Sequence, residues 1–185
     1  MKIFKISIFF VFALALIACG GNSTSNNSTE AKEGKQTASE EKANYSNMKQ
    51  LDLAEYNVPA FIYVLNESKG RQKIEETAYG SVQIEVGDRF GIEIVPFGLS
   101  LAEFKDELEN DMVYQIESIE EGENYFIYKK TIANSGTEAE YHFFLSTELE
   151  GDLYEVKSMN EKEFGKGAIE QMLNSAKSLS SKANT

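Results

Sequence analysis

The sequence has little of what catalytic and metal sites are usually built from. Its 185 residues include one cysteine, one histidine and no tryptophan. One cysteine excludes an intramolecular disulfide, and with a single histidine it cannot form a Cys/His metal cluster. The patterns G-x-x-x-x-G-K-[ST], G-x-G-x-x-G and G-x-S-x-G do not occur. We therefore predict no catalytic residue, no cofactor and no metal ligand.

Positive charge is also scarce. Lys and Arg number 18 against 30 Asp and Glu, which gives a net charge of −12 and a pI of about 4.6. The longest basic cluster is the pair Lys129 and Lys130. Because phosphate binding requires concentrated positive charge, we expect no nucleic-acid partner and no direct adsorption of the domain onto anionic lipid.

The net negative charge comes from one stretch of the chain. Residues 48–177 contain 12 basic and 26 acidic residues, a net charge of −14. Such a charge either keeps a protein soluble and away from anionic surfaces, or attracts a basic partner over a Debye length of about 8–10 Å.

The only long apolar run lies at the N-terminus. Lys2 and Lys5 precede residues 6–16, eleven residues without a charge. A basic start followed by a short apolar core is typical of a secretory signal peptide. A membrane-spanning helix needs about 20 apolar residues, and only sixteen residues, Lys5 among them, lie between Ile3 and Ala18. We predict that residues 1–18 are a signal peptide.

The apolar run ends in Leu16-Ile17-Ala18-Cys19, which contains the only cysteine. This stretch resembles the lipobox of bacterial lipoproteins. The resemblance implies that the Cys19 thiol receives a diacylglyceryl group, that the signal is cleaved between Ala18 and Cys19, and that the new N-terminus is acylated. Several acyl chains give a stable membrane anchor, whereas one chain binds only reversibly. The alternative is a secreted protein with a free thiol.

The residue after Cys19 bears on location. Many Gram-negative lipoproteins that stay in the inner membrane have Asp there, and this chain has Gly20. The resemblance therefore implies the outer membrane of the cell envelope.

A linker is predicted next, over residues 19–47. Residues 20–44 are Gly, Asn, Ser, Thr, Glu, Lys, Gln and Ala only, so they contain nothing that could form a core. The root-mean-square span of 25 flexible residues is about 25–30 Å. We predict a passive spacer that lets the domain stand off the bilayer.

The composition changes at Met48, and residues 48–179 are predicted to form one globular domain. Apolar runs and alternating patterns predict strands around 51–53 and at 60–65, 82–86, 90–95, 113–119, 124–132, 139–146 and 153–158. Gly87 and Asp88 predict a hairpin between the third and fourth of these strands. Turns at 120–123, 134–137 and 150–152 join the last four into an antiparallel meander.

Two helices are predicted. Ser100 and Glu103 have the spacing of a capping box, and Leu101, Phe104 and Leu108 recur at helical intervals, so we place a helix over 101–110.

The second helix follows the last strand. Asn160 and Glu163 are predicted to cap it, and its apolar stripe consists of Phe164, Ala168, Ile169, Met172, Leu173 and Ala176. Gly165 and Gly167 either weaken its first turns, by up to about 1 kcal/mol each, or permit close packing. Residues 180–185 are predicted to fray.

This order of elements predicts an α+β fold, with an antiparallel sheet covered by two amphipathic helices. A hairpin before a capped helix, then a meander and a closing C-terminal helix, resembles the PsbP-like fold. The resemblance covers residues 51–179 and rests on element order, so it implies no functional residue. Members of that fold mostly bind or assist partners.

Three chemistries remain to be weighed. His142 lies beside Phe143 and Phe144 in a strand, which favours a packed or sheet-surface histidine over a general base. The carboxylates of the first helix, Glu103, Asp106, Glu107, Glu109 and the following Asp111, could serve glycoside hydrolysis or bind calcium. Acidic residues at these spacings are more typical of a solvated helix face.

From the sequence we expect a non-enzymatic, lipid-anchored binding or accessory protein of the cell envelope. Its membrane contact is the lipid on Cys19, and its expected partner is a basic envelope protein. The alternatives are a small envelope hydrolase that uses paired carboxylates and a metal-binding module.

Overall fold

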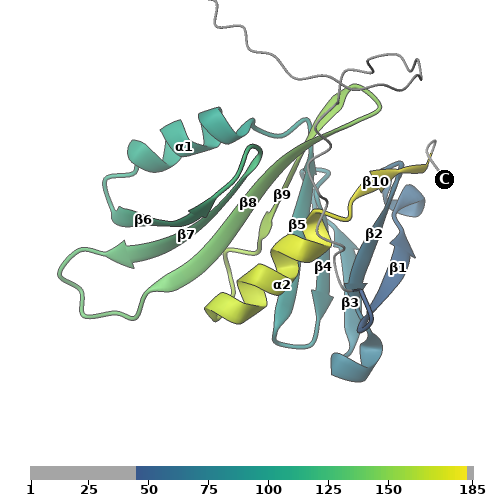
Figure 1. Cartoon of the computed structure of the whole chain (residues 1–185), viewed down its shortest axis with the longest axis horizontal. Coiled ribbons are helices and arrows are strands. Elements are labelled where there is room, and N and C mark those ends of the chain that lie inside the picture. The colour runs from purple at the N-terminus through teal and green to yellow at the C-terminus, as the bar shows by residue number, and fades with distance from the viewer. Residues whose placement is uncertain (1–44, 183–185) are drawn as a thin grey trace, which may run out of the picture. The chain divides into compact units, whose positions relative to one another are not determined.

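The computed structural model describes residues 45–182 and has the predicted α+β class (Figure 1). Its strands form two antiparallel sheets, one of seven strands and one of three. Ala18, Cys19 and nearly all of the predicted linker lie outside the described residues. Within residues 45–182, neither helix is long and apolar enough to cross a membrane.

The large sheet joins the predicted hairpin to the predicted meander. Both are confirmed, and β5 and β9 pair to connect them. Gly87, at the hairpin turn, has a φ of 58°. In spatial order the strands are β3 (Gln72–Glu76), β4 (Val82–Val86), β5 (Phe90–Pro96), β9 (Asp152–Ser158), β8 (Glu140–Leu149), β7 (Tyr125–Ile132) and β6 (Tyr114–Glu121).

The sequence pattern misses β3. This strand lies at the edge of the large sheet and pairs only with β4. Lys73, Glu75 and Glu76 are exposed on it. Charged edge strands discourage further strand pairing, and for that reason they lack the apolar alternation by which a strand is predicted.

A second sheet, also not predicted, consists of β1 (Met48–Asp52), β2 (Ala60–Leu65) and β10 (Ser180–Ser181). Short 3₁₀ helices follow its first two strands: η1 (Ala54–Tyr56) and η2 (Glu67–Lys69). The prediction that the chain frays after Leu179 is wrong as far as Lys182. β10 pairs with β2, and Lys182 Nζ lies 2.7 Å from Asp52 Oδ2. This pairing depends on hydrogen bonds with the backbone of β2, which the composition of residues 180–185 does not predict.

The domain also begins before Met48. The rings of Tyr45 and Tyr63 stack with centroids 4.5 Å apart, and Met48 N donates a hydrogen bond to Tyr45 O at 2.9 Å. The predicted linker boundary at residue 47 is therefore too late.

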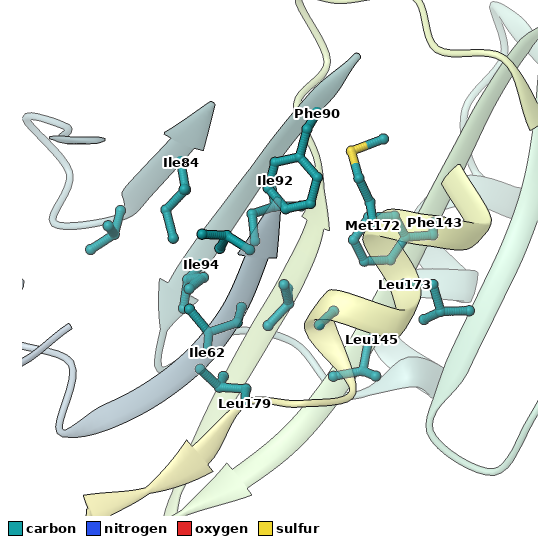
Figure 2. Close-up of a cluster of buried hydrophobic side chains, with 14 of the residues drawn as sticks. Ile62, Ile84, Phe90, Ile92, Ile94, Phe143, Leu145, Met172, Leu173 and Leu179 are labelled. Atoms are coloured by element: carbon teal, nitrogen blue, oxygen red, sulfur yellow. The ribbon is translucent and has the colours of Figure 1, made fainter. Parts of the chain in front are cut away.

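One face of the large sheet forms the main core. The helix α2 (Lys166–Ala176) and the small sheet pack against it, so we call it the α2 face (Figure 2). Its central residues are almost completely buried: Ile62, Ile84, Phe90, Ile92, Ile94, Phe143, Leu145, Met172 and Leu173. Since strand side chains alternate between faces, every second residue of β4, β5 and β8 contributes to this core.

The start of α2 differs from its prediction. Its N-cap is Gly165, so Asn160 and Glu163 are not caps. Phe164 is buried, but it precedes the helix. The prediction that it belongs to the apolar stripe of this helix is therefore wrong. A Cβ added at Gly165 or Gly167 would meet no atom within 4 Å, so the alternative of close packing is wrong.

The opposite face carries α1 (Leu101–Glu109), and we call it the α1 face. The predicted capping box is confirmed: Ser100 Oγ accepts from Glu103 N, and the Glu103 carboxylate accepts from Ser100 N at 2.9 Å. Phe104 stacks on Phe144 of β8 with ring centroids 4.0 Å apart. Each helix thus packs against a separate hydrophobic cluster.

Candidate functional site

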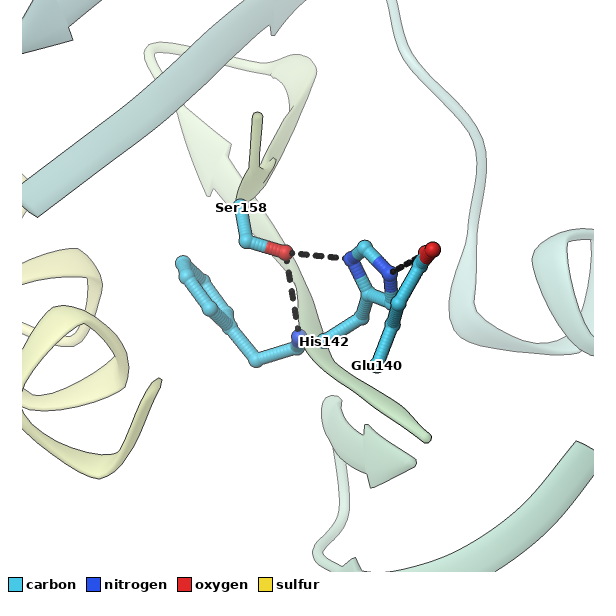
Figure 3. A network of polar contacts seen from close by, with 4 residues as sticks. Glu140, His142 and Ser158 are labelled. Atoms are coloured by element: carbon cyan, nitrogen blue, oxygen red, sulfur yellow. Dashed lines mark hydrogen bonds and ion pairs between the residues drawn. The ribbon is translucent and has the colours of Figure 1, made fainter. Parts of the chain in front are cut away.

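Three polar side chains meet at β8 and β9 in the order of a serine–histidine–carboxylate relay (Figure 3). Ser158 Oγ lies 3.1 Å from His142 Nδ1, and Glu140 Oε2 lies 3.3 Å from His142 Nε2. In a nucleophilic relay the serine oxygen must also reach a substrate.

The serine and the histidine of this cluster are closed to solvent, whereas the Glu140 side chain is partly exposed. His142 and Ser158 are each 1% exposed. Ser158 Oγ also accepts a hydrogen bond from Phe143 N at 3.4 Å, and the Tyr128 ring stacks on His142 with centroids 5.4 Å apart. His142 is thus packed, as predicted, and more deeply than a sheet-surface histidine. The cluster holds β8 to β9, and its serine has no open path to a substrate.

The protonation of His142 agrees with a structural role. Burial lowers the pKa of His142 below its ordinary value, Lys130 adds to this, and the hydrogen bond to Glu140 opposes it. The neutral ring with its proton on Nε2 donates to Glu140 and accepts from the Ser158 hydroxyl. Ser158 Oγ then still accepts from Phe143 N, so this one tautomer satisfies every contact.

An acidic groove lies between α1 and the β6–β7 hairpin. It has a volume of about 420 Å³. Its charged lining consists of Lys105, Asp106, Glu109, Glu121 and Glu123. Lys105 Nζ lies 2.8 Å from Glu121 Oε1, while Asp106, Glu109 and Glu123 form no ion pair within residues 45–182.

The groove lies in the most acidic part of the domain. Residues 101–123 contain nine acidic residues and one basic residue, a net charge of −8. The other 115 of the 138 described residues contain 17 acidic and 12 basic residues, a net charge of −5. More than half of the domain's net charge therefore comes from α1, β6 and the turn after β6.

The carboxylates of α1 do not converge. Glu103, Asp106, Glu107 and Glu109 are all exposed. In the part of the chain that the structure describes, no group of three or more His, Cys, Asp or Glu side chains could hold a metal ion. These carboxylates form an extended surface, which suits a large basic partner better than a single small cation.

A second hollow lies at the other end of the large sheet. Its volume is about 410 Å³, and the β7–β8 hairpin and residues 163–165 line it. Its charged side chains are of both signs: Lys130 against Glu138, Glu140 and Glu163. Lys130 Nζ lies 3.7 Å from the centre of the Tyr114 ring, so the cation there already has an aromatic partner.

The sequence and the structure agree on part of this surface. The acidic helix was recognised, but Glu121 and Glu123 were predicted only as part of a turn. The bulge between Ser118 and Glu120 and the packing of Lys105 on Glu121 bring that turn to α1. Neither is visible as a local pattern.

No protein-family model matches the chain, and no curated protein is detectably similar to it.

Proposed function

We propose that this protein is a non-enzymatic, lipid-anchored binding protein of the cell envelope, and that its acidic groove docks a basic partner. The observation that carries the proposal is the concentration of charge: residues 101–123 have a net charge of −8, and the rest of the described domain has −5. Three groove carboxylates, Asp106, Glu109 and Glu123, have no cation of their own within the described domain.

The physical basis is electrostatic complementarity. A surface of one sign raises the local concentration of an oppositely charged partner and speeds association, and added salt weakens the effect. At physiological ionic strength the attraction extends about 8 Å, so it acts on partners that already pass close to α1. A lipid anchor keeps the domain near such partners and limits its search to the membrane surface.

The anchor is the lipid expected on Cys19, followed by the linker, and the membrane is expected to be the outer membrane. What supports this is the lipobox resemblance of residues 16–19, with Gly20 next to the cysteine. Cys19→Ser should release the protein from membranes or stop its maturation, as measured by fractionation and by the mass of the mature chain. A Cys19→Ser variant that matures normally and stays on membranes contradicts the anchor.

A relation to the PsbP-like fold is also part of the proposal. The element order and the two helices on opposite faces of an antiparallel sheet support it. An experimental structure that superposes on members of that fold over residues 48–179 would test it.

The test of the binding function compares two variants of equal charge. The groove variant carries Asp106→Asn, Glu109→Gln and Glu123→Gln. The control carries Glu55→Gln, Glu76→Gln and Glu161→Gln, which are exposed and lie outside the groove. The lipidated protein is used to capture partners from envelope extract at low and at high salt.

We expect the wild-type protein and the control variant to retain a basic protein at low salt and to release it at high salt. The groove variant should capture about tenfold less of that protein at low salt. Equal capture by the two variants, or no capture at either salt, contradicts the proposed function.

A further inference from the structure

A strained and exposed aromatic residue stands just before α1. Phe97 has a φ of 55°, in the left-handed region, and is 78% exposed. That conformation is unfavourable for a bulky residue without an αL preference, and it persists only where the surroundings enforce it. Contacts within the domain enforce this backbone, whereas the exposure of the ring contributes nothing to folding.

The loop around Phe97 is held by a buried carboxylate. Glu155 is 4% exposed; its Oε2 accepts a hydrogen bond from Leu99 N at 3.2 Å, and its Oε1 lies 2.5 Å from Lys157 Nζ. Gly98 N donates to Leu153 O at 3.2 Å. These contacts fix the backbone on the C-terminal side of Phe97.

Gly98 lies too close to Glu155 to carry a side chain. A Cβ at this position would lie 2.3 Å from Glu155 Cβ and 2.9 Å from Glu155 N. On the N-terminal side of Phe97, Pro96 is paired with Tyr154 of β9. Both neighbours of Phe97 therefore lie against β9, while the Phe97 side chain extends into solvent.

A second aromatic residue is presented at the same end of the sheet. Tyr79, in the β3–β4 turn, is 98% exposed. Val82 of β4 pairs with Ile94 of β5, so this turn lies beside the end of β5 that leads to Phe97.

The turn of Tyr79 is also rigid. Thr77 Oγ1 accepts from Tyr79 N at 3.3 Å and lies 2.8 Å from Ser81 Oγ, which donates to Glu93 Oε1 at 2.6 Å. The backbone that carries each of these two exposed aromatic side chains is thus held by hydrogen bonds.

We infer that Phe97 and Tyr79 are the aromatic anchors of a docking surface for a basic protein partner, continuous with the acidic groove. This inference rests on the proposed function. Phe97 is three residues before Ser100, the N-cap of α1, so the anchor adjoins the helix that carries the charge. Aromatic residues dominate the energetics of protein interfaces because they bury a large area at low entropic cost. A surface with two anchors beside a net charge of −8 fits a partner that has apolar pockets among Lys and Arg.

The experiment uses the full-length lipidated protein in its own envelope, with a benzophenone amino acid as the probe. One reporter replaces Ala102, which is exposed and lines the acidic groove, and a second replaces Phe97 itself. Irradiation joins the probe to whatever lies against it, and mass spectrometry identifies the joined segment. The expected result is one protein adduct at both positions, through a segment rich in Lys and Arg.

The decisive comparison keeps the reporter at 102 and changes the anchors. Phe97→Gly removes the ring and relieves the left-handed backbone, so the domain should unfold at the same or a higher temperature while the adduct yield falls about tenfold. Tyr79→Ser should lower the yield as well. Met112→Ser is the matched control, because Met112 is 99% exposed and lies in the connection at the far end of α1. It should change the yield less than about twofold.

The outcomes separate the two proposals. An adduct at 102 that Phe97→Gly leaves unchanged overturns the anchors and keeps the proposed function. A lipid adduct at 97 means that the aromatic residues contact the membrane, which also overturns the anchors. If the wild-type protein gives no adduct at 102, both proposals are wrong.

Discussion

The two faces of the seven-stranded sheet differ in their side chains and in what covers them. The α2 face is apolar and covered along both halves, by α2 and by the three-stranded sheet. The α1 face carries one short helix, a cluster of four buried aromatic rings, and the polar groups His142, Glu93 and Glu155. The first face therefore supplies most of the buried apolar area, whereas the second positions charges and exposed rings.

This difference predicts which property of the protein a mutation on each face should change. Burial of apolar area contributes about 25 cal/mol per Å² to stability. Substitutions that remove buried side chains from the α2 face should therefore lower the free energy of unfolding. Substitutions on the α1 face should instead change the position of its loops, the pH dependence of stability and the binding of a partner. Each of the following predictions tests that division.

The largest effect is expected from a cavity in the α2 face. Phe143 is fully buried, and Phe143→Ala should lower the free energy of unfolding by about 3–5 kcal/mol. Phe104→Ala on α1 should cost about 2 kcal/mol, because Phe104 is 9% exposed and a nine-residue helix can settle into the gap. Urea unfolding of the two variants measures both values. Equal losses would mean that the two faces contribute alike.

A pair of glycines should respond with opposite signs. Gly98→Ala forces a Cβ against Glu155 and should destabilise the domain by about 1–3 kcal/mol. Gly167→Ala meets no atom within 4 Å and should stabilise α2 by up to about 1 kcal/mol. Thermal unfolding of both variants checks the signs. If Gly98→Ala is neutral, the clamp on the loop of Phe97 is loose.

Acid should destabilise the wild-type protein through His142. The folded pKa of His142 is lowered, chiefly by burial, and the unfolded value is about 6.5. Above pH 6.5 the histidine is neutral in both states, so its contribution is complete. As the pH falls below 6.5 the unfolded state binds the proton first, and stability falls by at most about 1.4 kcal/mol for each pH unit until the folded pKa is reached.

The control for this effect is His142→Gln. The stability gap between wild type and His142→Gln should shrink from pH 7 to pH 5 in urea unfolding. A gap that stays constant would show that His142 titrates alike in the folded and unfolded chains.

The smallest effect is expected at the cap of α1. Ser100→Ala removes the oxygen that accepts from Glu103 N and should cost about 1 kcal/mol. It should also raise the pKa of Glu103, which hydrogen bonds from Ser100 hold below its ordinary value. The Glu103 carboxyl titration, followed by NMR, distinguishes loss of the cap from general loosening, because Ala102→Gly should weaken α1 without moving that pKa.

Much of the fold is legible in local patterns. Strand 60–65, the hairpin at Gly87, the meander and the capped helix all follow from interactions between residues a few positions apart. The errors occur where a segment depends on a distant neighbour. β3 and β10 pair with strands that supply the missing hydrogen bonds, and α2 begins later because Phe164 packs from outside the helix. The candidate surface divides in the same way: the charge of α1 is local, but Glu121, Glu123 and Phe97 join it only through packing.

By itself the sequence determined the acidity of the domain and most of its regular elements, and it is the basis on which an export signal and a lipid at Cys19 are proposed. These depend on composition and on short spacings, which any part of the chain displays before it folds. Only the tertiary structure decided that His142 and Ser158 are closed to substrate, that Glu155 is buried beneath the loop before α1, and that Phe97 is strained and exposed. Each of these depends on which side chains from distant strands fill the space around it, and that is settled only when β5, β8 and β9 come together.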